Sequence, residues 1–267
     1  ACTVFVSAFL LFLVQPIIAK QILPWFGGSA SVWTTCLVFF QALLLAGYGY
    51  SHWSARSLKP ERQSLVHIVL LAISCVVLPI VASPDWEPQG GEDPGLRIIA
   101  LLGATVGLPY LLLSTTGPLI QVWYARNLDR VPYRLFALSN LGSLLGLLAY
   151  PFAIEPWVST RLQSNAWSAG YALFAILCAL SAWASRHGQP VRASRAIETD
   201  THAKPPAAAT RLLWFGLSAT GSMLLLAVSN HICQNIASIP FLWIVPLSLY
   251  LLTFVLCFDT SGWYRRG

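Results

Sequence analysis

Charged residues are scarce in this sequence, and acidic residues are absent from its long apolar stretches. Only 10 % of the 267 residues are charged, whereas 56 % are hydrophobic and the mean hydropathy is +0.65. Because an average soluble domain has about 25 % charged residues, this composition excludes an ordinary water-soluble protein. The lack of Asp and Glu in the apolar stretches argues against a proton-coupled pump or a polyamine carrier, since both usually rely on buried carboxylates.

Several motifs that carry chemistry are also missing. The six cysteines stand singly, without a CxxC pair, so they fit small core residues better than zinc ligands. Neither Gly27-Gly28 nor Gly90-Gly91 follows a strand in the way of a nucleotide-binding turn. His67 could ligate a haem or chlorophyll metal, but without a partner it is more typical of a packed core histidine. We therefore expect no catalytic residue, cofactor or metal in this span.

The sequence instead contains eight stretches that are long and apolar enough to cross a bilayer. A hydrocarbon core of about 30 Å needs roughly 20 residues of helix, because every backbone N–H and C=O in lipid must be paired within its segment. We therefore predict an all-α fold, a polytopic membrane helix bundle with about eight transmembrane helices. The predicted spans are residues 3–23, 31–50, 64–82, 97–123, 133–154, 164–185, 212–237 and 241–258.

Basic residues gather on every second connection between these spans. The connections after the second, fourth, sixth and eighth spans hold thirteen Lys and Arg residues, whereas the opposite connections are mostly acidic. Positive charge is retained on the cytoplasmic side of a membrane, so both termini of the chain are predicted to be cytoplasmic. Orientation in a membrane explains the formal charge of +6 better than nucleic acid does, because no basic patch with interleaved aromatics is present.

A polar segment divides the chain into three parts. Residues 187–211 are rich in Pro, Ala and charge, too polar to pack in lipid, and they predict a flexible cytoplasmic linker. The linker separates a six-helix bundle, residues 1–186, from two further transmembrane helices, residues 212–267. This layout is typical of a six-plus-six, major-facilitator-like transporter that stops after its eighth span.

A small set of polar residues inside the spans forms the candidate functional site. Lys20 could pair with an anionic ligand or lipid head group beside Gln15 and Gln21, or it could lie near the helix end and extend its ammonium to the outer interface. The amides and the histidine could line a polar site, or they could form hydrogen bonds between helices. The complete candidate set is Gln15, Lys20, Gln21, Asn140, His231, Gln234 and Asn235.

Four blocks of the chain resemble a known family. They are FLLFLVQPIIAKQILPWFGGSASVWTTCLVFFQALLLAGYGYSH (9–52), GLPYLLLSTTGPLIQVWYAR (107–126), PYRLFALSNLGSLLGLLAYPF (132–152) and SNHICQNIASIPFLWIVPLSLYLLTFVLCFD (229–259). These blocks are similar to the membrane part of bacterial proteins described as fused major-facilitator and spermidine synthase-like. The resemblance implies a cytoplasmic aminopropyltransferase-like domain beyond Gly267 and a location in the bacterial inner membrane.

Two functions follow as hypotheses. In the first, the chain is an integral membrane scaffold or anchor, surrounded by membrane lipid and associated with protein partners in a larger complex. In the second, it transports a neutral or anionic small solute. A cavity lined by the candidate residues favours transport, whereas a dry core in which they bond to one another favours the scaffold.

The charge pattern predicts the sidedness of the chain. A cysteine introduced at Ser194, in the polar linker, should remain unlabelled by a membrane-impermeant maleimide in sealed cells and react after permeabilisation, because basic connections stay inside. Ser159→Cys, in the connection before the sixth span, is the matched control and should react in sealed cells. Labelling of Ser194→Cys in sealed cells would reverse the predicted orientation.

Overall fold

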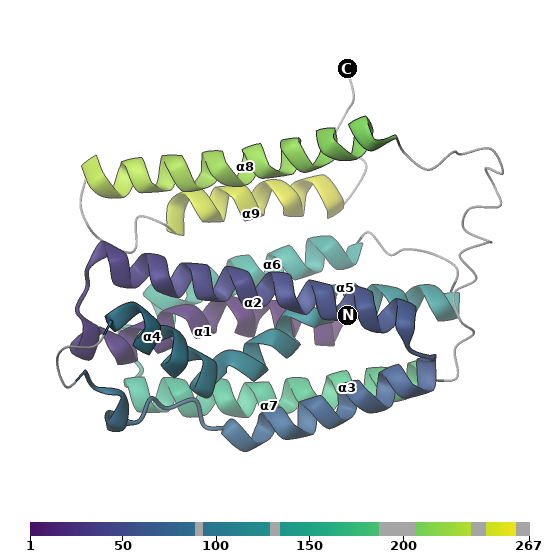
Figure 1. Cartoon of the computed structure of the whole chain (residues 1–267), viewed down its shortest axis with the longest axis horizontal. Coiled ribbons are helices and arrows are strands. Elements are labelled where there is room, and N and C mark those ends of the chain that lie inside the picture. Colours follow the sequence, from purple (N-terminus) through teal and green to yellow (C-terminus); the bar gives the residue numbers. More distant parts are fainter. Residues whose placement is uncertain (89–92, 129–133, 187–206, 236–243, 260–267) are drawn as a thin grey trace.

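The computed structural model is an all-helical bundle in which most of the long helices run alongside one another (Figure 1). It describes residues 1–88, 93–128, 134–186, 207–235 and 244–259. The long helices are α1 (Cys2–Phe26), α2 (Ala30–Ser57), α3 (Pro60–Ser74), α5 (Leu108–Leu128), α6 (Arg134–Ala149), α7 (Thr160–Ser185), α8 (Ala208–Asn235) and α9 (Ile244–Asp259). Shorter elements are η1 (Cys75–Val77), η2 (Pro84–Trp86), α4 (Pro94–Leu102), η3 (Gly103–Gly107) and η4 (Tyr150–Ile154).

The helices have the length and composition of membrane spans. Within the described residues, seven helical stretches are long and apolar enough to cross a membrane, and the apolar helix at Ile244–Cys257 is shorter. The prediction of a polytopic helix bundle is therefore confirmed, while the count of eight full spans is confirmed for seven. The predicted eighth span, residues 241–258, begins outside the described residues. The chain is a polytopic membrane protein.

The helix that forms the third span begins and ends earlier than predicted. It was expected at residues 64–82, but α3 begins at Pro60 and the helical region ends at Val77. The cause is Pro79, since a proline disfavours helical backbone at the residue before it. Leu78 accordingly adopts an extended conformation with ψ 148°. Residues 78–82 are therefore a connection at the end of the bundle and not the last turn of a span.

Two of the spans contain a π-helical turn. The predicted fourth span corresponds to a helical stretch over Pro94–Ala125. Within this stretch, the π-helical turn η3 lies between α4 and α5. In the predicted fifth span, η4 follows α6 and includes Pro151 at its start. Glycines at both ends of η3 and the proline in η4 weaken the regular helical ladder. A π-turn changes the direction of the residues that follow it, and Glu155 comes directly after η4.

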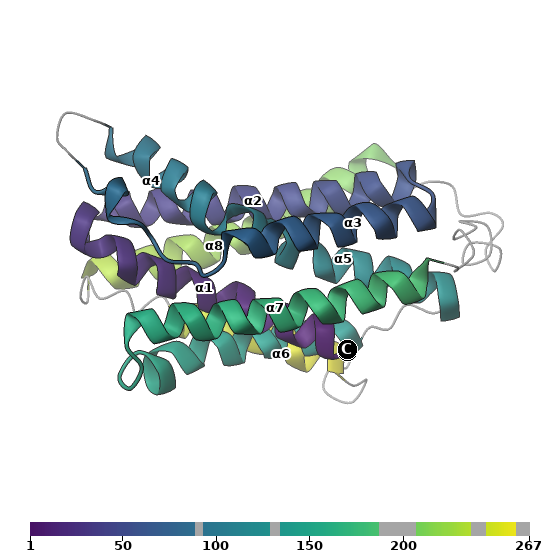
Figure 2. The ribbon, with the colours of Figure 1, turned by 90° about the horizontal axis from the view of Figure 1, so that it is seen from below.

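Helix α1 lies in the interior of the bundle. It packs against α5, α6 and α7, and Figure 2 shows it crossing the middle of the bundle, partly behind α7. Its apolar residues Val14, Ile17, Ile18 and Ile22 are at most 1 % exposed. A helix that is apolar all round is typical of such a central position. It ends at Gly27, whose φ of 76° is unfavourable for any residue with a side chain.

The contact between α1 and α6 depends on two glycines. A Cβ atom added at Gly142 would lie 2.8 Å from the carbonyl oxygen of Phe5, and one at Gly146 would lie 2.6 Å from that of Phe9. Both distances are below normal van der Waals contact. Small residues spaced four apart allow two membrane helices to approach closely. The backbone of α6 therefore rests directly against that of α1.

Helices α8 and α9 lie at the side of the bundle. Figure 1 shows α8 outermost and α9 between it and α6. The principal described neighbour of α8 is α9, and α9 in turn packs against α6. Among the described residues, α8 is therefore attached to the bundle chiefly through α9.

The glycine contact gives a stability prediction. Replacing Gly146 with Ala should lower the free energy of unfolding by about 1–3 kcal/mol, because the added methyl group overlaps the backbone of α1. Gly221→Ala is the matched control, since nothing lies within 4 Å of a Cβ at that position. The control should be neutral or slightly stabilising, because Ala favours helix over Gly. Thermal unfolding of the purified chain in detergent measures both, and equal effects would contradict the close contact.

Candidate functional site

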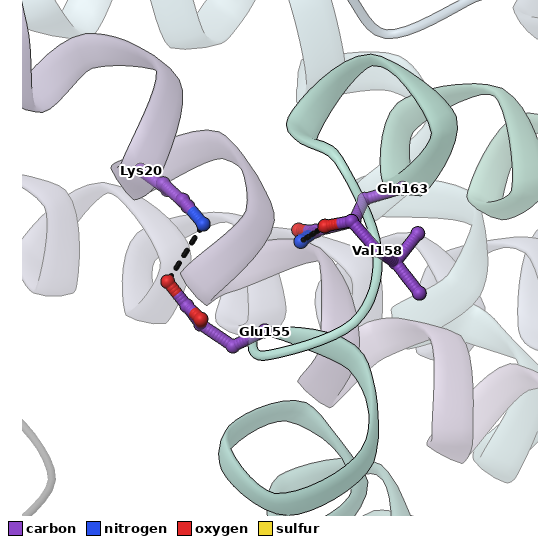
Figure 3. A network of polar contacts seen from close by, with 4 residues as sticks. All are labelled: Lys20, Glu155, Val158 and Gln163. Carbon is purple, nitrogen blue, oxygen red and sulfur yellow. Dashed lines mark hydrogen bonds and ion pairs between the residues drawn. The ribbon is translucent and has the colours of Figure 1, made fainter.

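Lys20 forms an ion pair within the protein. Its Nζ donates a hydrogen bond to Oε1 of Glu155 over 2.6 Å, joining α1 to the residue that follows η4 (Figure 3). The two side chains are 34 % and 30 % exposed, so water screens part of the attraction. Neither of the two alternatives proposed for Lys20 included this partner. The sequence contained one signal for it, since Glu155 is the acidic residue at the end of the predicted fifth span.

Gln21, next to Lys20, fixes the connection after α3. Its Nε2 donates to the carbonyl oxygen of Ile80 over 3.3 Å and to Oγ of Ser164 over 3.0 Å. Its Oε1 accepts from the backbone N–H of Ala82 over 2.9 Å. One amide therefore ties α1 to α7 and to the extended segment at residues 80–82. This segment does not form helix, and Gln21 supplies hydrogen bonds that a helix would otherwise provide.

Gln15 and Asn140 also have partners inside the protein. Gln15 Nε2 lies 3.4 Å from the hydroxyl oxygen of Tyr110, a long hydrogen bond between α1 and α5. Asn140 Nδ2 donates to the carbonyl oxygen of Phe136 on its own helix over 2.8 Å. The amide of Asn140 bonds locally, while the three candidates on α1 each bond to another element.

The candidates on α8 lie apart from those on α1. His231 is exposed on α8, which lies at the side of the bundle. The side chains of Gln234 and Asn235 lie outside the described residues. The predicted convergence of His231 with these two amides therefore stays a prediction.

Gln163, which does not belong to the predicted candidate set, lies near the ion pair. This residue of α7 is 2 % exposed, and its Nε2 donates to the carbonyl oxygen of Val158 over 2.7 Å. Its Oε1 is buried and has no hydrogen-bond partner among the described residues. Figure 3 shows the side chain extending from α7 toward the side on which Lys20 and Glu155 lie. A buried polar atom of this kind is commonly satisfied by an ordered water.

A second buried polar cluster lies around His67. The imidazole is fully buried, with Nδ1 3.5 Å from the hydroxyl of Tyr50 and Nε2 3.5 Å from Sγ of Cys178. Its ring also packs edge-on against the indole of Trp123, with the centroids 5.7 Å apart. Both ring nitrogens therefore face protein groups. This environment favours the structural role of His67 over the metal-ligating one.

These polar groups can stabilise the association of the helices. In lipid, hydrogen bonds between helices compensate for the cost of burying polar side chains, and each contributes about 1 kcal/mol. Among the described residues, no three His, Cys, Asp or Glu side chains come together as a metal site would require. The ammonium group of Lys20 faces the carboxylate of Glu155 over 2.6 Å.

Comparison with known proteins adds no family assignment. No protein-family model, curated protein or solved structure matches this chain significantly.

The ion pair predicts a measurable coupling. Lys20→Met and Glu155→Gln should each lower the melting temperature, and the double variant should lose less than the sum of the two. Because both groups are about one third exposed, the coupling energy should be about 0.5–1 kcal/mol. The combination of Lys20→Met with Glu61→Gln, an acid at the start of α3, is the control and should be additive. Additive effects in both cycles would contradict a stabilising pair.

Proposed function

We propose that this chain is an integral membrane scaffold or anchor that associates with protein partners in a larger membrane complex. The observation that carries this proposal is the bonding of its intramembrane polar groups to one another. Gln15, Lys20 and Gln21 all face partners within the protein. A scaffold needs a fixed interior, and such cross-links between helices supply it.

The exposure of α8 supports the proposal that a partner protein binds to this helix. In its most apolar stretch only 6 % of the residues are buried, against 56 % in α1. Phe215 and Met223 are 74 % and 69 % exposed. Lipid alone tolerates exposed apolar side chains, but the middle of this helix also carries small residues that suit close contact with another helix.

Gly221 lies on an accessible face of α8, between two leucines. Leu217, Gly221 and Leu224 recur at spacings of four and three, so they share one side of the helix. A Cβ at Gly221 would meet nothing within 4 Å. A helix from a partner subunit fits this side, because the missing side chain at Gly221 permits close approach. The resemblance to spermidine synthase-like fusion proteins makes an aminopropyltransferase-like domain a further candidate for what the bundle anchors.

The alternative, transport of a neutral or anionic solute, has less support. Lys20 was the group proposed to attract an anion, and Glu155 already neutralises it at 2.6 Å. The amides proposed to bind a neutral solute are engaged with Tyr110, Ser164 and the backbone. Transport through these residues would require these contacts to break first.

Site-specific photo-crosslinking in native membranes tests the scaffold. A benzophenone side chain at Leu217 of α8, which is 64 % exposed, should give a protein adduct of one defined mass, because the partner lies against this helix. The same probe at Leu180 of α7, which is 60 % exposed, is the control and should give no such adduct.

A second variant separates partner binding from folding. Gly221→Leu should abolish the adduct at Leu217 without lowering the melting temperature, since the added side chain meets open space within the chain. Lipid adducts alone at both Leu217 and Leu180 would contradict the proposal.

A further inference from the structure

A groove lies at the end of the bundle where the connection after α3 meets the start of α4. Its volume is about 550 Å³, and it is lined by Asp85, Trp86, Asp93, Leu96, Arg97 and Ala100. This volume falls within the range of pockets that hold small organic ligands, about 300–1,000 Å³. Among the described residues that line the groove, none belongs to the candidate site proposed above, so the groove is treated as a separate feature.

One wall of the groove is a single face of α4. Asp93, Leu96, Arg97 and Ala100 recur at spacings of three, one and three, which places them on the same side of the helix. The charged residues lie toward the N-terminal end of this face, and Ala100 lies one turn deeper in the membrane span. The groove therefore changes from polar to apolar along its length. This change matches an amphiphile, which has a polar head and an apolar tail.

The opposite wall is held in place by Arg97. Its Nε donates to the carbonyl oxygen of Trp86 over 2.9 Å, and its Nη2 donates to those of Asp85 and Glu87 over 3.1 Å and 2.9 Å. These bonds fix the turn at η2 against α4. Asp85 and Trp86 thereby line the same groove as Asp93 on α4.

The two carboxylates give the groove its negative character. Asp85 accepts from Oγ of Ser83, and Asp93 accepts from the backbone N–H of Gly95 as the N-cap of α4. Within the described residues, neither carboxylate forms an ion pair with a basic side chain. Together with Arg97, the described residues of the lining carry two negative charges and one positive charge. This charge set complements a group that carries an ammonium next to a phosphate.

We propose that this groove binds a phospholipid with an ethanolamine head group. The primary ammonium bonds to Asp85 and Asp93, since it can donate to both carboxylates. The phosphate lies near the positive charge of Arg97, and the start of an acyl chain follows Leu96 and Ala100 into the membrane. The indole of Trp86 covers the boundary between head group and chain, where Trp is favoured in membrane proteins.

Native mass spectrometry of the purified full chain tests the proposal. After titration with phosphatidylethanolamine or phosphatidylglycerol, one molecule of phosphatidylethanolamine should be retained at a concentration about 5-fold lower, because only its head group carries the ammonium. Asp85→Asn with Asp93→Asn should remove this preference. Asparagine keeps the hydrogen-bond acceptor at both positions and is itself a good N-cap, so the fold should be preserved. Glu61→Gln, an acid in α3 outside the groove, is the control.

A second variant tests the apolar part of the groove. Ala100→Phe should weaken retention of phosphatidylethanolamine about 5-fold or more by filling the space, whereas Ile99→Phe, on an adjacent exposed position, should not. Equal retention of the two lipids with no effect of either groove variant would overturn the proposal, since it would indicate ordinary lipid contact. Binding of soluble phosphoethanolamine as tight as that of the lipid would also overturn it, because the acyl chain would then contribute nothing.

Discussion

The fold depends on the burial of one helix, α1, inside the bundle. In lipid the hydrophobic effect does not drive helices together, so association depends on close packing and on polar contacts. Helix α1 uses both. Its glycine-lined contact with α6 brings two backbones together, and its amides and lysine bond to α5, α7 and the connections. Helices α5, α6 and α7 are held to α1 by these contacts.

The spans themselves could be predicted because a bilayer imposes simple requirements. In lipid, an apolar segment of about 20 residues can pair its own backbone N–H and C=O groups only as a helix. Composition and length are therefore sufficient to locate it. Pro79 lies inside the predicted third span, and its effect on Leu78 is a local sequence signal that the helix ends before this residue. The π-turns at η3 and η4 are not encoded by a comparable local pattern, because glycine and proline also occur in regular membrane helices.

The polar contacts could not be predicted from the sequence, since they join residues far apart in the chain. Lys20 and Glu155 are 135 positions apart, and Gln21 and Ser164 are 143 apart. Their pairing depends on which helices become neighbours and on the rotation of each helix about its axis. The candidate set included three residues of α1 because polar groups within a span call for an explanation. Their partners lie on α5, directly after η4 and on α7, so they depend on the packing of α1 against several elements.

The three hydrogen bonds of Gln21 connect the interior of the bundle with its edge. Two of them hold residues 80–82 to α1, and this segment leads within three residues to Asp85. A change in the tilt of α1 therefore has to displace the connecting segment or break its bonds to Gln21. By thermodynamic reciprocity, a molecule that prefers one position of that segment also shifts the equilibrium tilt of α1. The lipid composition of the surrounding membrane is thereby coupled to the tilt of the central helix.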